Sequence, residues 1–270
     1  MKTGKLFRRF ILNLVGLAGV FSLHAQNQAS APAPATPALT NAPPPKPKAV
    51  WKGSAAVGAT VTGGNSQTTL ATATADVDRK TDANEWSAGA DAAYGQSKTS
   101  GQTETTTTAN LVHGFTQYNL LFTDRFYGYA RVEARHDDVA AIRYRVSLGG
   151  GAGYYFIKNT NTDLSLEVGP GYVWQKQGAD TSDFATLRVG EKFHQALSDR
   201  ARLWESAEWL PQVDKFDNYY VNGELGIEAD MSKDKKLSLR SYVTDSFNNE
   251  PAAGKKRNDV TWVTAIAYKF

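Results

Sequence analysis

The sequence of 270 residues predicts an all-β fold, a 12-stranded antiparallel up-and-down transmembrane β-barrel over residues 51–270. Apolar and polar residues alternate along most segments, turn residues separate them, and no helical periodicity is long enough to cover a sheet. Many segments run past ten residues, whereas strands of soluble proteins most often have about 5–6 residues and membrane strands need about 9–11. Aromatic residues fall near segment ends, as the interfacial girdles of a membrane barrel require.

Residues 1–25 have the features of a cleavable signal peptide. Four basic residues open the segment: Lys2, Lys5, Arg8 and Arg9. The apolar run 11–23 follows, with a suitable cleavage site after Ala25, and it is shorter than the roughly 20 apolar residues of a spanning helix. Without these four basic residues, the formal balance of 30 basic and 27 acidic residues becomes 26 against 27, a net charge of −1. The charge therefore points neither to nucleic acid nor to an anionic membrane.

Residues 26–50 contain 7 of the 10 prolines and almost nothing that could build a core. This composition predicts a disordered, partly extended periplasmic linker. A binding segment or a cell-wall spacer is the alternative. The absence of cysteine fits an exported protein without disulfides, but it is equally compatible with a cytosolic one.

The predicted strands follow the linker with short spacing. They cover 51–61, 68–78, 86–94, 103–118, 126–135, 142–156, 164–175, 185–194, 201–213, 219–228, 237–243 and 260–270. An even number of strands places both chain ends on one side, so that a periplasmic linker would put the turns at 80–84, 121–125, 158–162, 197–200 and 231–235 there. The longest connection, 247–259, would then be external.

The alternation is clearest at 142–156, where Ile142 and Tyr144 fall on the apolar face and Arg143 and Arg145 on the polar face. It is poorest at 103–118 and 201–213. In the first of these, Ala109, Leu111 and Phe115 share a face with His113; in the second, Glu205 lies beside Leu203 and Trp209.

The closing segment 260–270 places six residues on one apolar face and a small face with Lys269 on the other. Ile266, Tyr268 and the terminal Phe270 match the C-terminal assembly signal of outer-membrane barrels, whose last strand closes against the first. The alternative is a half-buried strand of a soluble sandwich. A sandwich would have shorter strands and large apolar residues facing inward, whereas here the apolar face is thin in Leu and Ile and the opposite face is charged.

The charged face predicts a polar lumen. The candidate lumen residues are Arg131, Glu133, Arg135, Arg143, Arg145, Glu167, Arg188, Lys192, Glu224, Glu228 and Arg240. Strands lie about 4.8 Å apart, so that arginines can reach glutamates on the next strand. The cluster is either a salt-bridge network that fills the barrel or the charged constriction of a pore. Its basic excess would favour anions in a pore.

A catalytic site is not expected, and neither a cofactor nor a metal is implied. No serine stands two residues from His113, His136 or His194, as a lipid-facing phospholipase pair would require. The cluster 136–138 could form a His–Asp catalytic pair or bind a divalent cation weakly, although an Asp-rich turn is more often simply solvated. The glycine runs 149–153 and 169–171 precede no helix, and we expect them to permit strand bending and close packing rather than phosphate binding.

Several motifs resemble the YdiY-like salt-induced outer-membrane proteins, a family of undetermined function. They are the segment from Trp51 to Gly58, the turn from Thr62 to Ser66, the Arg-x-Arg segment from Arg143 to Tyr154, the segment from Leu166 to Tyr172, and the stretch from Pro251 to Lys256. The resemblance covers residues 51–270. It implies the outer membrane of a Gram-negative cell and a salt or osmotic response, and it supplies no substrate or catalytic residue. The proline-rich linker departs from a minimal member of the family.

The resulting functional hypothesis is a narrow channel for ions or small solutes. The alternative is a non-conducting structural barrel whose lumen is filled by a salt-bridge network. Expected partners are outer-membrane lipid, the barrel-assembly machinery and small anionic solutes, but not nucleic acid.

Overall fold

The computed structural model of the chain describes residues 49–62, 66–99 and 104–270. The predicted signal peptide and nearly all of the predicted linker lie outside the described residues, as do residues 63–65 of the turn from Thr62 to Ser66 and residues 100–103, which include the start of the predicted strand 103–118. Val50, which we placed at the end of the linker, begins the first strand. In the described part of the chain, no helix has the length and apolar character needed to cross a membrane.

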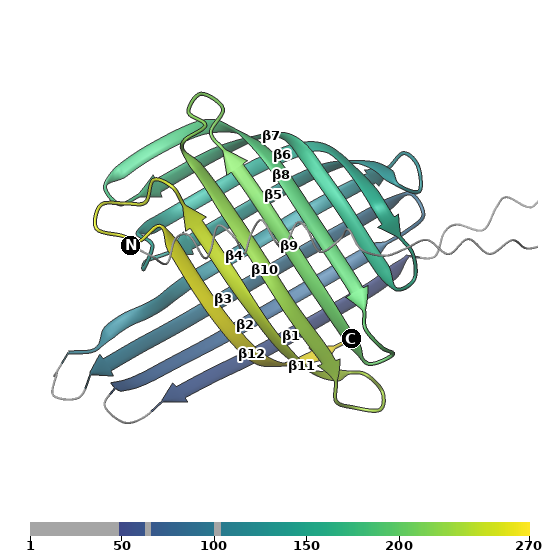
Figure 1. Cartoon of the computed structure of the whole chain (residues 1–270), viewed down its shortest axis with the longest axis horizontal. Coiled ribbons are helices and arrows are strands. Elements are labelled where there is room, and N and C mark those ends of the chain that lie inside the picture. Colours follow the sequence, from purple (N-terminus) through teal and green to yellow (C-terminus); the bar gives the residue numbers. More distant parts are fainter. Residues whose placement is uncertain (1–48, 63–65, 100–103) are drawn as a thin grey trace, which may run out of the picture. The chain divides into compact units, whose positions relative to one another are not determined.

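Twelve antiparallel strands form a closed barrel in which each strand pairs with its neighbours in sequence (Figure 1). They are β1 (Val50–Thr62), β2 (Ser66–Lys80), β3 (Asn84–Thr99), β4 (Thr106–Leu121), β5 (Phe126–Asp137), β6 (Ile142–Lys158), β7 (Thr162–Gln177), β8 (Asp180–Ala196), β9 (Ala201–Pro211), β10 (Tyr219–Asp230), β11 (Leu237–Asn248) and β12 (Asn258–Lys269). The predicted fold class is confirmed. The strands are mostly longer than predicted, and β4 begins and ends three residues later than expected.

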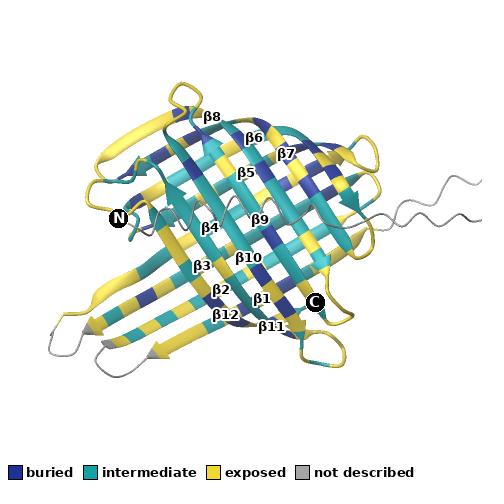
Figure 2. Cartoon of the chain, viewed as in Figure 1, coloured by how far each residue is buried: buried dark blue, intermediate teal, exposed yellow. Residues whose placement is uncertain are grey.

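Burial alternates along the strands (Figure 2). The exposed side chains of the strands are mostly apolar, and many of the buried ones are polar or charged. On β7, Leu166 and Val168 are 42% and 47% exposed, whereas Glu167 between them is 1% exposed. This pattern is the reverse of a soluble protein, in which charged residues are almost never fully buried unless paired. It is the pattern of a barrel surrounded by lipid.

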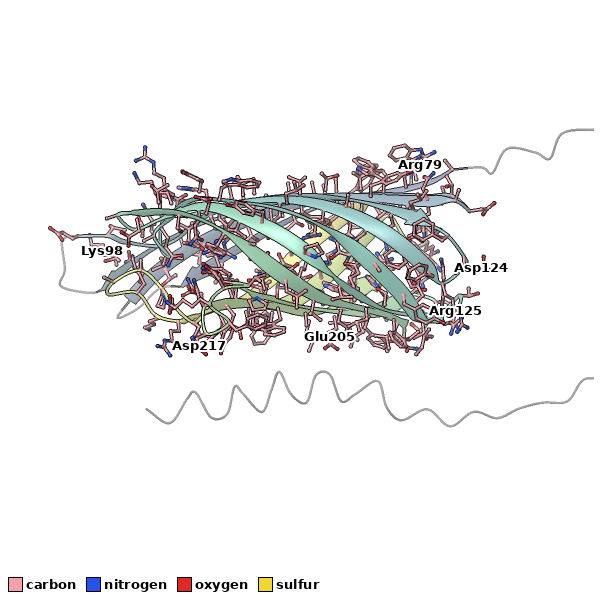
Figure 3. The ribbon with its side chains drawn as sticks, turned by 90° about the horizontal axis from the view of Figure 1, so that it is seen from above. Arg79, Lys98, Asp124, Arg125, Glu205 and Asp217 are labelled. Carbon is pink, nitrogen blue, oxygen red and sulfur yellow. The ribbon has the colours of Figure 1, made fainter. Side chains whose placement is uncertain are left out.

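Aromatic residues that are exposed or half-buried gather near the strand ends. Trp86 pairs with Tyr118 across β3 and β4, and Phe126 pairs with Tyr154 across β5 and β6. Charged residues occupy the connections beyond them: Figure 3 shows Asp124 and Arg125 at one end of the barrel. Aromatic rings followed by charged turns are typical of the boundary between hydrocarbon and headgroups.

A bulge at the start of β6 overturns part of the predicted alternation. The register with β7 shifts between Ile142 and Tyr144, so that Arg143 occupies the extra position. Ile142 is consequently buried at 4% exposure and Arg143 is exposed, the opposite of our prediction. After the bulge, the residues of β6 alternate as predicted again, and Arg145 faces the lumen.

Two glycines of the predicted bending segments lie where the backbones of β6 and β7 approach closely. A methyl group on Gly151 would overlap the carbonyl oxygen of Val168, and one on Gly169 would overlap the carbonyl oxygen of Gly150. The expectation of close packing at these glycines is confirmed.

The barrel closes through a short pairing between β1 and β12. The register covers four residue pairs, from Ser54–Lys269 to Val57–Ile266, and two backbone hydrogen bonds between Gly53 and Phe270 extend it. The β11–β12 register, in comparison, covers eleven pairs. Small buried side chains line the lumen side of the seam: Ala56, Val263, Ala265 and Ala267.

Candidate functional site in the charged lumen

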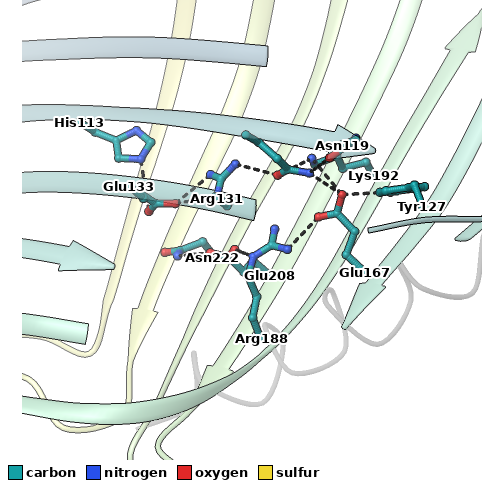
Figure 4. A network of polar contacts seen from close by, with 11 residues as sticks. His113, Asn119, Tyr127, Arg131, Glu133, Glu167, Arg188, Lys192, Glu208 and Asn222 are labelled. Atoms are coloured by element: carbon teal, nitrogen blue, oxygen red, sulfur yellow. Dashed lines mark hydrogen bonds and ion pairs between the residues drawn. The ribbon is translucent and has the colours of Figure 1, made fainter. Parts of the chain in front are cut away.

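Glu167 on β7 is the centre of what we call the lumen network (Figure 4). Its Oε1 accepts hydrogen bonds from Gln117 Nε2 at 2.7 Å and from the Tyr127 hydroxyl at 3.0 Å. Its Oε2 accepts from Arg188 Nη1 at 2.7 Å, and Lys192 Nζ lies 3.5 Å from Oε1. A buried carboxylate is costly unless it is paired. These donors therefore stabilise the charged form of Glu167, which is only 1% exposed.

Arg188 on β8 joins two carboxylates from the strands on either side of it. It donates to Glu167 on β7 and, through Nε, to Glu208 on β9. We expected ion pairs between adjacent strands, because a lumen-facing arginine is long enough to reach a glutamate on the next strand.

A second branch runs through Arg131. Its guanidinium donates to Glu133 at 2.8 Å and to Gln117 Oε1 at 3.4 Å. Glu133 lies 3.3 Å from His113 Nε2, and His113 Nδ1 lies 2.6 Å from Asp91. The chain of contacts therefore extends from β3 to β9 without a break.

Glu228 on β10 is the centre of a separate set, the seam network. It lies 2.5 Å from Arg202 Nη2, 2.6 Å from Arg240 Nε and 3.1 Å from Lys269 Nζ. Arg240 extends further, to Asp76 at 3.2 Å and to Ser54 at 2.7 Å. This network connects β9, β10, β11 and β12 with β1 and β2.

The remaining predicted lumen residues have smaller sets of contacts. Arg135 pairs with Asp137 at 2.7 Å, and Glu224 accepts a hydrogen bond from Trp204 Nε1 at 2.5 Å. Arg145 donates to the amide oxygens of Gln175 and Gln177. Arg143 is the predicted residue that the structure excludes from the lumen, because the β6 bulge leaves it exposed.

The predicted terminal residues Ile266, Tyr268 and Phe270 all lie on the exposed face, at 51%, 49% and 72% exposure. Their role in barrel assembly remains a prediction.

Sequence reasoning missed the neutral and aromatic members of the lumen. Gln117 and Tyr127 contact Glu167 directly, and Asn119 and Tyr155 donate to Glu85. All four lie at alternate positions that face the lumen, and this alternation was the available signal. We considered only the charged positions, and we missed Glu208 because the alternation in its strand is poor.

Two small cavities lie among the lumen side chains. A cavity of about 10 Å³ lies beside Arg131, Glu133 and Arg188. A second, of about 30 Å³, lies beside Arg135, Arg145 and Tyr220, and we call it the loop-end cavity because residues of the 249–257 connection also line it. Since one water needs about 10–15 Å³, each space has room for a water or a small ion.

His113 and His136, two of the histidines considered for catalysis, both lie beside carboxylates. Both ring nitrogens of His113 contact carboxylates, and His136 contacts the backbone oxygen of Arg143 and Asp138. Across residues 49–62, 66–99 and 104–270, no three His, Asp or Glu side chains come together in a way that could hold a metal ion.

Residues 55–270 match the family described as "Protein of unknown function, DUF481". The chain belongs to this family. No curated protein matches the chain. The family assignment thus agrees with the barrel boundaries and supplies no activity.

Solved structures resemble the chain in fold. The NanC porin aligns at a TM-score of 0.50 with 9% identity, over 80% of this chain and all of that chain. The translocator domain of the autotransporter NalP from Neisseria meningitidis aligns at 0.43 with 16% identity, over 82% and 88%. The COG4313 outer-membrane channel from Pseudomonas putida F1 aligns at 0.43 with 12% identity, over 85% and 97%. The closed twelve-stranded barrel and the NanC alignment together show that the chain has the fold of outer-membrane β-barrels.

Proposed function

We propose that the protein is a narrow channel of the Gram-negative outer membrane for ions and small solutes, with a preference for anions. The observation that carries the proposal is the lumen itself. Ionic side chains line it from Glu85 and Lys158, which lie 3.7 Å apart at the end of the barrel that carries Phe270, to Arg145 near the other end. A row of charged side chains with water-sized cavities between them can pass small ions but no large solute.

The Arg188–Glu208 pair is the constriction of this pathway. It forms one wall of the cavity of about 10 Å³, and Arg188 is only 5% exposed. The double variant Arg188→Ala/Glu208→Ala removes one charge of each sign and much side-chain volume. We expect it to increase the single-channel conductance in planar lipid bilayers.

Arg145→Glu tests the anion preference. Reversing this charge replaces a cation of the pathway with an anion, so that the ratio of chloride to potassium permeability should fall. Arg143→Glu on the same strand should leave the ratio unchanged, because Arg143 lies outside the lumen. If the unaltered protein gives no discrete currents, the channel proposal is wrong.

A non-conducting structural barrel is the second candidate. It is favoured by the burial of Glu167 and Glu228, at 1% and 2% exposure, within networks that satisfy most of their hydrogen-bonding capacity. Absence of current, together with high resistance to unfolding, would support this candidate.

The link to salt or osmotic stress rests on the resemblance to YdiY-like proteins and on nothing in the geometry. Growth of a deletion strain at high and low osmolarity tests it. Export and assembly are tested by fractionation: the mature protein should appear in the outer membrane, and removal of Phe270 should reduce its amount there.

A further inference from the structure

Arg145 differs from the other lumen arginines in its partners. Arg131, Arg188 and Arg240 each contact at least one carboxylate. Among the described residues, Arg145 has no carboxylate within 4.0 Å and donates only to neutral amide oxygens, Gln175 Oε1 at 2.8 Å and Gln177 Oε1 at 3.0 Å.

The surroundings of Arg145 make an unpaired charge costly. Its guanidinium carbon lies 3.9 Å from the centre of the Tyr220 ring, which is 5% exposed, and the buried Ile142 lines the same cavity. The ring face stabilises the cation but does not neutralise it. A partly buried cation without a counter-ion is a place where an anion binds favourably.

The loop-end cavity lies directly against Arg145. Its lining includes four basic residues, Arg135, Arg145, Lys256 and Arg257, and one acidic residue, Asp259. Asp137 outside the lining neutralises Arg135, which leaves three basic residues against one acidic residue. Lys256 and Arg257 are exposed on the longest connection, where they raise the local concentration of anions.

A hydrogen-bond donor also remains available in this wall. Among the described residues, the buried Nε of Arg135 has no hydrogen-bond partner. Its Nη1 donates to Ser246 Oγ at 3.1 Å, and since that hydroxyl oxygen acts as acceptor there, its own hydrogen is free to donate.

We propose that the loop-end cavity is a binding site for a small inorganic anion of the size of chloride, with Arg145 as its principal ligand. The volume of about 30 Å³ has room for one such ion. The proposal goes beyond conduction, since an anion can occupy this site whether or not ions cross the barrel.

The β6 bulge provides a matched control. Arg143 and Arg145 are two residues apart on one strand, but only Arg145 lines the cavity. Arg143→Gln and Arg145→Gln therefore remove the same charge from the same strand, once outside the site and once inside it.

The first experiment measures chloride binding to the full chain in detergent micelles by ³⁵Cl NMR line broadening, with bromide as competitor and gluconate holding the ionic strength constant. We expect excess broadening that bromide displaces. Since a charge-assisted contact is lost, Arg145→Gln should weaken the affinity by about 10- to 100-fold, and Arg143→Gln should leave it unchanged. Equal losses in both variants, or no displaceable broadening in the unaltered protein, would overturn the proposal.

A second experiment needs no variant and so remains decisive if Arg145→Gln fails to fold. Crystals of the unaltered protein grown in bromide should show an anomalous peak in contact with the Arg145 guanidinium, and absence of a peak there would refute the site. Chloride binding without bilayer currents would remove the channel proposal and keep this one. Bilayer currents without chloride binding would refute the anion site and leave the channel proposal standing.

Discussion

Arg240 on β11 donates a hydrogen bond from Nη2 to Ser54 Oγ on β1, 2.7 Å away, although 186 residues separate the two and β12 lies between their strands. The side chain passes over β12 where that strand presents Ala265 and Ala267, both at most 5% exposed. Since the β1–β12 pairing is short, Arg240 supplies a side-chain connection across the seam that the backbone provides only in part.

Arg240→Met should therefore destabilise the barrel. It removes one partner from Glu228 and another from Asp76, and breaking such a buried pair costs about 3–5 kcal/mol. Arg202→Gln is the control: its side chain contacts the same Glu228 but is 49% exposed, so that the loss should be about 1 kcal/mol or less. Denaturant unfolding in lipid vesicles measures both, and equal losses would show that the connection across the seam adds nothing.

The Glu167–Arg188 pair should behave as a coupled unit. Glu167→Gln leaves Arg188 with Glu208 alone, and Arg188→Gln leaves Glu167 with Lys192 as its remaining cation. We expect the double variant to be more stable than the sum of the single losses predicts, with a coupling of about 1–3 kcal/mol. Additive losses would mean that the buried contact contributes little.

The close approach of β6 and β7 predicts a local intolerance of methyl groups. Gly151→Ala should destabilise the barrel by about 1–3 kcal/mol, because the backbones must separate to admit the new atom. Gly223→Ala should have almost no such effect, since the nearest atom to an added methyl is Ser206 O at 3.9 Å. The same unfolding assay compares them, and a neutral Gly151→Ala would contradict the observed packing.

Glu205 on β9 presents a carboxyl on the outer face, where its register partners are Phe193 and Leu225 (Figure 3). Its Oε1 is buried and has no hydrogen-bond partner among the described residues. Glu205→Leu should therefore raise the free energy of unfolding in lipid, by about 1–2 kcal/mol. The matched change at the inward Glu208 should lower it, because it removes a partner of Arg188. A loss of stability in Glu205→Leu would indicate that the carboxyl has a partner in the membrane.

The sequence was sufficient to predict which side chains face the lumen wherever the strand period of two runs unbroken. Glu167, Arg188 and Arg240 were placed correctly because every second residue of a strand shares its face. Arg143 was misplaced because one extra residue in a bulge reverses the parity, and no residue type near Ile142 marks that insertion.

The partners across the lumen could not be predicted. Gln117 on β4 meets Glu167 on β7, and two strands lie between theirs. That contact depends on the tilt and stagger of the closed barrel, which are properties of the whole sheet rather than of either segment. The strand order, in contrast, follows from short connections between consecutive antiparallel strands.

The measurement that tests the account most directly compares the two faces of β11. The chain has no cysteine, so that Val243→Cys and Thr244→Cys each give one site for a nitroxide label. Val243 faces outward at 36% exposure and Thr244 is half-buried on the opposite face. In lipid vesicles we expect the label at 243 to collide mainly with oxygen, which concentrates in hydrocarbon, and the label at 244, inside the barrel, to collide with oxygen far less often. If the label at 243 instead collides mainly with a polar nickel chelate, water rather than lipid surrounds the barrel, and the assignment of its two faces is wrong.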